Sequence, residues 1–183
     1  MIAQETERLV LRNFQASDWQ ALQAMIVQYQ ASEMAPYDQP WPTTPEDIQG
    51  VTHWFSSGDQ YHAVCLKEGG QLIGFVALNP ESEADNRVFN LGYVFDADFH
   101  GQGFATEACR AVLQNAFDKL GVERVITGTA ALNLPSSRLL AKLGFQKTKQ
   151  SMVSFYSTED GKPIEFLGEE YSLNKETWMK MRT

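Results

Sequence analysis

The spacing of apolar residues alternates along the chain between the two-residue period of a strand and the three-to-four-residue period of a helix. The strand period recurs at residues 8–14, 61–67, 72–78, 88–95 and 124–129, and after Phe145 in two strands that the turn Asp160-Gly161 joins. The helix period recurs at residues 17–29, 44–55, 103–120 and 133–143. The resulting order, βααβββαβαββ, predicts one α/β (α+β) domain over residues 1–183, with a mixed, largely antiparallel central sheet flanked by helices.

Capping residues mark where these helices begin and end. Ser17, with Gln20 three residues later, is typical of a capping box, and Thr44 stands before a proline at the first helical position. Asn133 suits the N-cap of the last of these helices, and Gly144 suits the residue after its C-cap. These local signals agree with the periodicity.

Composition restricts the class of protein. The chain has 183 residues, of which 43% are hydrophobic and 21% charged, as expected for a soluble globular protein with a sizeable core. No apolar run approaches the ~18–20 residues of a membrane span, and the first residues lack the pattern of a signal peptide. Cys65 and Cys109 lie in apolar runs without metal-ligand spacing, so we expect buried reduced thiols and no metal. The sequence thus predicts a cytoplasmic protein that does not bind membranes.

Charge is distributed unevenly, within a net charge of −8. Residues 31–100 carry eleven acidic and two basic side chains, whereas residues 101–150 carry three acidic and seven basic ones. This division suits a cationic ligand on one side and an anionic ligand on the other, although solvation of the surface is the more ordinary explanation. The acidic total disfavours nucleic acid as a partner, because phosphate contacts need a basic face.

A glycine-containing turn precedes the third predicted helix. It consists of His100, Gly101, Gln102, Gly103, Phe104, Ala105 and Thr106. Glycines let the backbone turn tightly and approach a ligand, and the start of a helix attracts anions, so this turn predicts a phosphate-bearing ligand. A dinucleotide fingerprint is disfavoured, because it needs a third glycine where Thr106 stands and a strand leading directly into the turn.

A second motif follows one predicted helix and one predicted strand later. It is Asn133-Leu134-Pro135-Ser136, with Gly144-Phe145 closing the helix. With the turn at 100–105 in this order, the chain resembles the GNAT superfamily of acyl-coenzyme A-dependent N-acetyltransferases. Four further segments resemble the ribosomal-protein N-terminal (alanine) acetyltransferase subfamily of that superfamily: residues 6–12, residues 91–94 (Leu-Gly-Tyr-Val), residues 103–108, and residues 171–173 with 176–178.

The resemblance implies a function and a cofactor site. It implies transfer of the acetyl group of acetyl-coenzyme A to a primary amine, either a protein N-terminus or a small cationic amine, by direct attack on the thioester. Backbone N–H groups of residues 101–106 would hold the pyrophosphate, and an N–H near Tyr93 or Phe95 would polarise the thioester carbonyl. The cofactor-binding residues expected on this basis are Phe95, His100, Gly101, Gln102, Gly103, Phe104, Ala105, Thr106 and Asn133, with Arg138 or Lys142 at the 3′-phosphate. Solvation of the surface explains these two bases equally well.

The chain departs from the family pattern at three positions. His100 stands where the motif has Gln or Arg, Leu140 stands where many members place a tyrosine acid, and Asn90 stands where many have a glutamate. We therefore expect Asn133 and Ser136 to orient the thioester sulfur and assist protonation of the thiolate, with helix capping alone as the alternative.

Glu107 is a further candidate for acid–base chemistry. Its place in the first turn of a helix also suits a structural role beside the helix dipole, and we consider that role the more common one.

The acceptor is expected to meet the proline-rich and aromatic segment before the second helix, together with that helix. The candidate residues are Tyr37, Asp38, Trp41, His53 and Trp54, with Tyr93 at the predicted reaction centre. The alternative is that these aromatic residues pack the first two helices onto the sheet. A non-catalytic coenzyme A sensor on the same fold stays open as a second function, and a homodimer is compatible with the sequence.

Overall fold

The computed structural model describes residues 4–82 and 85–182. Within them one mixed sheet has the strand order β1-β2-β3-β4-β5-β6-β8-β7. The strands are β1 (Gln4–Glu5), β2 (Leu9–Asn13), β3 (Tyr61–Leu66), β4 (Leu72–Ser82), β5 (Asp85–Phe95), β6 (Arg124–Ala130), β7 (Gln146–Ser157) and β8 (Pro163–Asn174). The pair β5–β6 is parallel and the other neighbours are antiparallel, so the sheet is mixed and largely antiparallel, as predicted.

The helices connect these strands in the predicted order. They are α1 (Trp19–Gln30), α2 (Pro45–Ser56), α3 (Phe104–Lys119), α4 (Leu134–Lys142) and α5 (Lys175–Met181), with 3₁₀ turns η1 (Ala16–Asp18), η2 (Ala35–Tyr37) and η3 (Ala97–Phe99). None of the helices in the described part of the chain is long and apolar enough to cross a membrane.

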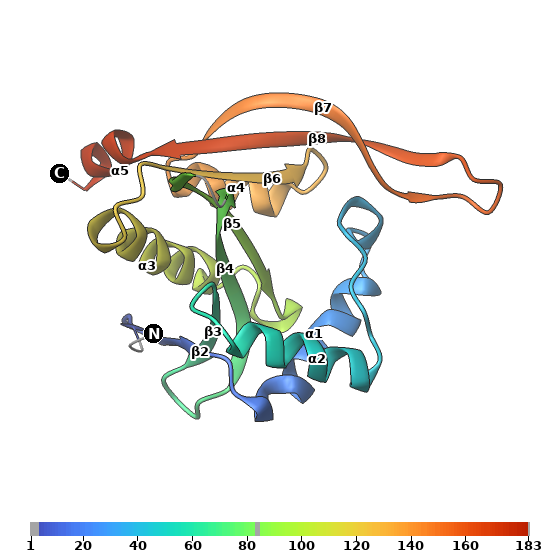
Figure 1. The fold of residues 1–183 in the computed structure, drawn as a ribbon, viewed down its shortest axis with the longest axis horizontal. Coiled ribbons are helices and arrows are strands. Elements are labelled where there is room, and N and C mark those ends of the chain that lie inside the picture. Colours follow the sequence, from blue (N-terminus) through green and yellow to red (C-terminus); the bar gives the residue numbers. More distant parts are fainter. Residues whose placement is uncertain (1–3, 83–84, 183) are drawn as a thin grey trace.

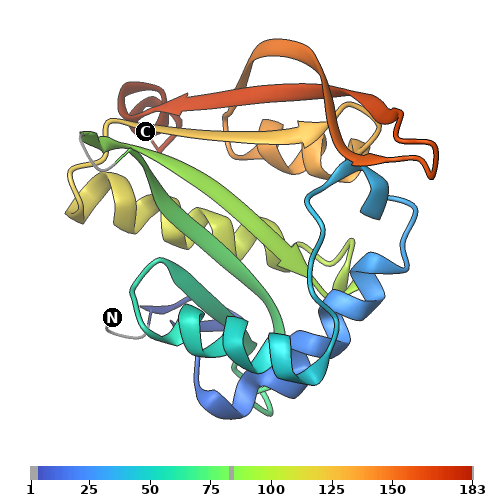
Figure 2. The same cartoon turned by 45° about the vertical axis from the view of Figure 1, so that its right-hand side comes forward.

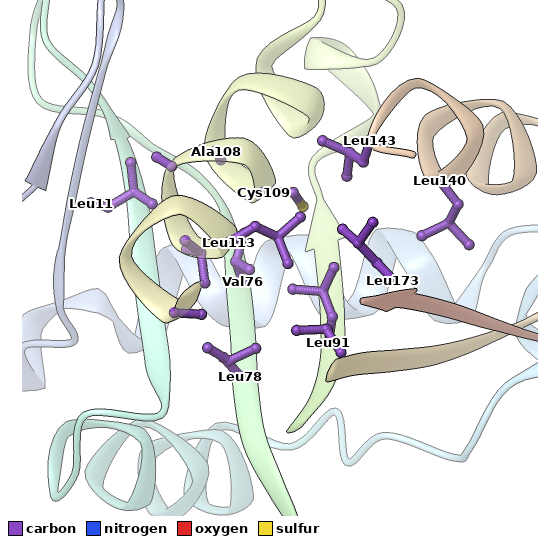
Figure 3. Close-up of a cluster of buried hydrophobic side chains, with 14 of the residues drawn as sticks. Leu11, Val76, Leu78, Leu91, Ala108, Cys109, Leu113, Leu140, Leu143 and Leu173 are labelled. Atoms are coloured by element: carbon purple, nitrogen blue, oxygen red, sulfur yellow. The ribbon is translucent and has the colours of Figure 1, made fainter. Parts of the chain in front are cut away.

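Two apolar cores lie on opposite faces of the sheet (Figures 1 and 2). On one face, α3 and α4 bury leucines such as Leu113 and Leu140 against Leu91 and Leu173 of the strands (Figure 3). On the other face, α1 and α2 cover a cluster that includes Phe55. Burial of an aliphatic or aromatic side chain stabilises the fold by roughly 1.5–3 kcal/mol, so the periodic apolar positions read from the sequence hold both layers in place.

The parallel pair β5–β6 separates after a short contact. Its register covers Val88–Asn90 against Arg124–Ile126, and beyond these residues the two strands diverge. The Thr127 hydroxyl donates a 2.7 Å hydrogen bond to the Leu91 carbonyl at the point of divergence. The end of β5, residues 91–95, therefore has β4 along one edge and a gap between strands along the other.

The structure confirms most of the predicted caps and corrects one. The Thr44 and Asn133 side chains accept hydrogen bonds from the backbone at the starts of α2 and α4, and Gly144 has a positive φ of 87° after α4. The prediction of Ser17 as an N-cap is wrong, because a 3₁₀ turn capped at Gln15 precedes α1. Asp18 fixes this turn by accepting the Gln15 backbone N–H at 2.7 Å.

Two short elements lie outside the predicted order. Strand β1 adds two residues at one edge of the sheet, and helix α5 follows β8. Helix α5 spans seven residues, and it buries Trp178 against Phe117 of α3 with ring centroids 5.8 Å apart. Helices of this length depend on tertiary packing, so periodicity does not reveal them.

Candidate active site

The glycine turn forms the start of α3 as expected. Gly101 and Gly103 have φ values of 75° and 86°, a backbone conformation that residues with a Cβ rarely adopt. Gly103 is the N-cap of α3, and no side chain caps the helix there. The first N–H groups of a helix lack partners within the helix, so this end is suited to an anion.

A hollow of ≈ 370 Å³ lies beside this helix start. Its lining combines the turn with two cations and two acids: Gly103, Thr106, Arg110, Lys142, Glu7 and Glu107. Of the two predicted partners of the 3′-phosphate, Lys142 lines the hollow, whereas Arg138 lies exposed on α4. Arg110, one helical turn and a half into α3, was not predicted.

Arg8 ties the N-terminal segment to the glycine turn. Its Nε donates to Glu107 Oε2 at 2.7 Å, its Nη1 donates to the Gln102 carbonyl at 3.0 Å, and its guanidinium lies 4.2 Å from the Phe104 ring centroid. Thr6 Oγ1 donates to Glu107 Oε1 at 2.6 Å. These contacts hold the N-terminal segment against the glycine turn and the first turn of α3.

Glu107 is engaged on both carboxylate oxygens. Burial alone would raise the pKa of Glu107, but the hydrogen bonds from Thr6 and Arg8 outweigh it and lower that pKa. An ionised carboxylate that already accepts several hydrogen bonds is a poor proton acceptor. The geometry therefore favours the structural role of Glu107 over acid–base chemistry.

The edge of β5 that faces the gap carries backbone donors. Asp96 N–H donates to the Ile73 carbonyl of β4, and since strand N–H groups alternate sides, those of Tyr93 and Phe95 face the gap. His100 Nε2 lies 2.9 Å from the Phe95 carbonyl, so His100 also lies at the end of this strand. Gly74 on β4 leaves the room that the Phe95 ring occupies, because a Cβ there would lie 2.3 Å from that ring.

The start of α4 meets the same strand. Ser136 Oγ lies 2.7 Å from the Tyr93 hydroxyl, and the Ser136 backbone N–H donates to Asn133 Oδ1 at 3.2 Å. Burial raises the pKa of the Tyr93 hydroxyl above its ordinary value, so this group stays protonated. Leu140, at the position of the family tyrosine, is fully buried in the core.

A second pocket, of ≈ 340 Å³, lies between η2, the end of β6 and the β7–β8 hairpin. Its polar and backbone lining consists of Asp38, Gln39, Asn90, Gly128, Thr129, Ala130, Asn133, Ser151, Gly168, Glu169 and Glu170. Its apolar and aromatic lining consists of Tyr29, Met34, Tyr37, Val153, Phe155 and Phe166. Three carboxylates thus line the pocket; Glu169 and Glu170 are paired with Lys147 and Lys149, which do not line it themselves.

Two of these carboxylates are held firmly. Asp38 Oδ2 accepts a 2.7 Å hydrogen bond from the Tyr29 hydroxyl. Glu169 accepts from Lys147 Nζ at 2.7 Å and from the Tyr171 hydroxyl at 2.5 Å, and these hydrogen bonds lower the pKa of Glu169 to about 2. Both side chains therefore present oxygen atoms in fixed positions.

The predicted acceptor residues divide into two groups. Tyr37 and Asp38 line the second pocket, and the Tyr37 ring contacts that of Phe166 at 5.4 Å between centroids. Trp41 and Trp54 instead contact Phe55 in the core beneath α2, as the packing alternative predicts. His53 is exposed on α2, and Trp54 is 56% exposed. Trp41, His53 and Trp54 do not line the pocket.

Sequence reasoning missed the residues that the C-terminal hairpin contributes. Phe155 of β7 and Phe166, Glu169 and Glu170 of β8 line the pocket from more than a hundred residues beyond Tyr37. Glu169 offers a weak signal for this contribution. It lies at a buried position of β8, and a buried acid without a partner is unfavourable, so a partner or a ligand is expected beside it.

A helix start suited to an anion, next to two parallel strands that separate, fits the coenzyme A site that the resemblance implies. The model of the acetyltransferase (GNAT) domain matches residues 8–146, so the chain belongs to the GNAT acetyltransferase family. This membership confirms the predicted acetyl-transferring enzyme, in a family that uses acetyl-coenzyme A as co-substrate, and disfavours the non-catalytic sensor.

Individual relatives agree with this assignment. The chain is 28% identical over 145 residues to the uncharacterized N-acetyltransferase YnaD of Bacillus subtilis, covering 78% of this chain and 81% of that protein. It is 30% identical over 122 residues to the FsC-acetyl coenzyme A-N(2)-transacetylase of Aspergillus fumigatus, covering 62% of this chain and 50% of that enzyme.

Solved structures confirm the predicted fold. The acetyltransferase (GNAT family) from Bacillus anthracis superposes with a TM-score of 0.81 at 22% identity, covering 96% of this chain and 99% of that one. The ribosomal-protein-S5-alanine acetyltransferase from Vibrio fischeri superposes with a TM-score of 0.75 at 19% identity, covering 97% and 99%.

Proposed function

We propose that this enzyme transfers the acetyl group of acetyl-coenzyme A to a small cationic primary amine bound in the pocket between η2 and the β7–β8 hairpin. The observation that carries the proposal is the lining of that pocket, in which Asp38 meets aromatic walls and has no Lys or Arg partner among the described residues, whereas Glu169 and Glu170 are paired with Lys147 and Lys149. Carboxylates and aromatic faces both attract organic cations.

The size of the pocket supports a small acceptor. Its volume of ≈ 340 Å³ is near the lower end for ligand sites, and Tyr37 and Phe166 meet across it. A protein N-terminus would need a longer open groove for the residues that follow the reacting amine.

The residues around the glycine turn fit the phosphates of the co-substrate. The turn supplies N–H groups of residues 101–106, and Arg110 and Lys142 supply positive charge in the adjoining hollow. The N–H groups of Tyr93 and Phe95 would polarise the carbonyl of the thioester, which supplies an activated acetyl group.

The acceptor amine must be neutral to attack, so the enzyme acts chiefly by bringing it to the thioester and removing water from its path. Asn133 lines the acceptor pocket and also caps α4 through Ser136. This position supports the prediction that Asn133 and Ser136 orient the sulfur of the thioester.

The test is acetyl-coenzyme A-dependent thiol release across a panel of small diamines, small monoamines and peptides with free N-termini. We expect a diamine or monoamine cation to be the best acceptor and Asp38→Asn to raise its KM about tenfold, because a charged hydrogen-bond partner is lost. Glu46→Gln, which removes an exposed acid of α2 outside the pocket, is the matched control. Preference for the peptides, or an unchanged KM in Asp38→Asn, would contradict the proposal.

A further inference from the structure

The end of helix α1 carries two consecutive polar side chains, Gln28 and Tyr29, that contact different parts of the molecule. Figure 2 shows this end of α1 close to both the loop after β5 and the segment around η2. The helix is fixed there, because its apolar stripe is buried against the sheet and the Tyr29 ring packs against the same core cluster. Successive helix positions point about 100° apart, so the two side chains leave α1 in different directions.

The Gln28 amide uses both of its ends on the loop after β5. Its Nε2 donates to Asp96 Oδ1 at 3.1 Å, and its Oε1 accepts from the Ala97 backbone N–H at 2.7 Å. The loop continues as η3, where the Asp98 carbonyl accepts a 3.0 Å hydrogen bond from Gln102 Nε2 of the glycine turn. Gln28 therefore holds the segment that leads from the end of β5 into the glycine turn.

The Tyr29 hydroxyl holds the carboxylate of Asp38. It donates to Oδ2 at 2.7 Å, while the Gln39 backbone N–H donates to Oδ1 at 2.7 Å, so both oxygens have fixed positions in the pocket. Burial and the neighbouring Asp38 carboxylate raise the pKa of Tyr29, so the phenol remains a neutral donor. A neutral donor fixes the carboxylate without compensating its negative charge, as a Lys or Arg partner would.

We propose that Gln28 and Tyr29 are positioning residues for the two substrates, Gln28 for acetyl-coenzyme A and Tyr29 for the amine. Gln28 acts through residues 96–99, which set where the glycine turn begins, and Tyr29 acts through Asp38, which meets the cation. Since the two residues are neighbours on one helix, α1 also fixes where the acceptor pocket lies relative to the glycine turn. The role of Tyr29 rests on the proposed function, whereas the role of Gln28 requires only that coenzyme A binds at the glycine turn.

The first measurement is the Kd of coenzyme A by isothermal titration calorimetry, with no amine present. Gln28→Met keeps the length of the side chain and removes both hydrogen bonds, so we expect Kd to rise about fivefold. Gln28→Glu keeps an acceptor for the Ala97 N–H but places a second carboxylate beside Asp96, so it should weaken binding as well. Gln20→Met, the same change at an exposed position of α1, is the matched control and should keep the wild-type Kd.

The second measurement is steady-state kinetics with the best acceptor. Tyr29→Phe keeps the ring and removes the hydroxyl, so the KM for the amine should rise about fivefold while kcat and the KM for acetyl-coenzyme A stay at wild type. Gln28→Met should show the reverse pattern. In the Asp38→Asn background, Tyr29→Phe should have at most a small further effect, because Tyr29 acts through that carboxylate. Tyr61→Phe, on β3 in the same aromatic core, is the matched control and should behave as wild type.

An unchanged Kd of coenzyme A in Gln28→Met would overturn the inference, and so would an equal rise of both KM values in either variant, because a general loss of stability affects both substrates alike. The inference also fails if Tyr29→Phe leaves the KM for the amine unchanged while Asp38→Asn raises it. Failure of the proposed function is distinct, since it shows as an unchanged KM in Asp38→Asn or as a preference for peptides. The role of Tyr29 then fails with it, and the Kd of coenzyme A decides the role of Gln28.

Discussion

Individual side chains of this enzyme have roles that their partners determine. Glu107 and Glu169 are both carboxylates with lowered pKa values, yet one fixes the glycine turn through Arg8 and the other lines the pocket at the β7–β8 hairpin beside Lys147. Neither role follows from the residue type. The helix position of Glu107 suggested a dipole partner, but nothing near Glu169 in the sequence indicates Lys147, 22 residues away.

The lowered pKa of Glu169 predicts an acid-dependent contribution to stability. The folded-state pKa of about 2 lies below the ordinary value of 4.5, so the stabilisation is complete above pH ~4.5 and is lost as the pH falls toward 2. Glu169→Gln should therefore lower the melting temperature at pH 7 and match wild type near pH 2. Thermal unfolding followed by circular dichroism across this range measures the difference.

Glu159→Gln is the control, since Glu159 is an exposed acid in the β7–β8 turn. If the melting temperatures of Glu169→Gln and wild type differ by the same amount from pH 7 to pH 2, the charge of Glu169 is not the source of the difference.

At the scale of elements, the short pairing of β5 with β6 creates the site. Antiparallel pairing with β4 continues to Phe95, whereas parallel pairing with β6 ends at Asn90. The end of β5 is thereby left with N–H groups directed into the gap. Gly74 supports this geometry from β4, because its missing side chain makes room for the Phe95 ring.

Gly74→Ala should disturb the site through this contact. A Cβ at residue 74 would lie 2.3 Å from the Phe95 ring, so the ring must move away from its place at the end of β5. We expect a loss of stability of about 1–3 kcal/mol from overpacking and weaker binding of coenzyme A. Thermal unfolding and isothermal titration calorimetry measure the two effects.

Gly92→Ala is the matched control on the adjacent strand, where a Cβ would meet Ala77 at an ordinary 3.7 Å. Equal losses of stability in the two variants would rule out the contact with Phe95 as the cause.

Over the whole molecule, the acidic and basic halves of the sequence correspond only partly to separate sites for a cationic and an anionic ligand. Of the described acids within residues 31–100, Asp38 lines the pocket proposed for the acceptor, and the other two carboxylates there, Glu169 and Glu170, come from β8. Of the bases within residues 101–150, Arg110 and Lys142 line the hollow beside the glycine turn. The remaining charges serve other surfaces, in line with solvation as the ordinary explanation.

Both sites should nevertheless respond to salt. The KM values for the amine and for acetyl-coenzyme A should both rise several-fold between low and physiological ionic strength, because each ligand meets charge of opposite sign. Steady-state kinetics in a salt series measures this, with a neutral osmolyte series as control. A KM for the amine that does not change with salt would argue against binding by the carboxylates.

The sequence alone determined the elements other than β1 and α5, their order, the glycine turn and the Asn133 cap. These features depend on neighbouring residues, through side-chain periodicity, backbone sterics and hydrogen bonds over three or four positions. It also supplied the family resemblance, because the motifs are local. It failed locally at Ser17, where Asp18 is drawn into a bidentate pair with Arg12 and a 3₁₀ turn replaces the predicted cap.

Only the tertiary structure decided which residues meet. Strand order and register bring Glu169 and Tyr37 into the lining of one pocket and leave Trp54 in another cluster, and the fold brings Tyr93 to Ser136, 43 residues apart. These contacts depend on how the sheet twists and where its pairing stops. They depend on packing between residues that lie far apart in the sequence, so no short segment of the sequence reveals them.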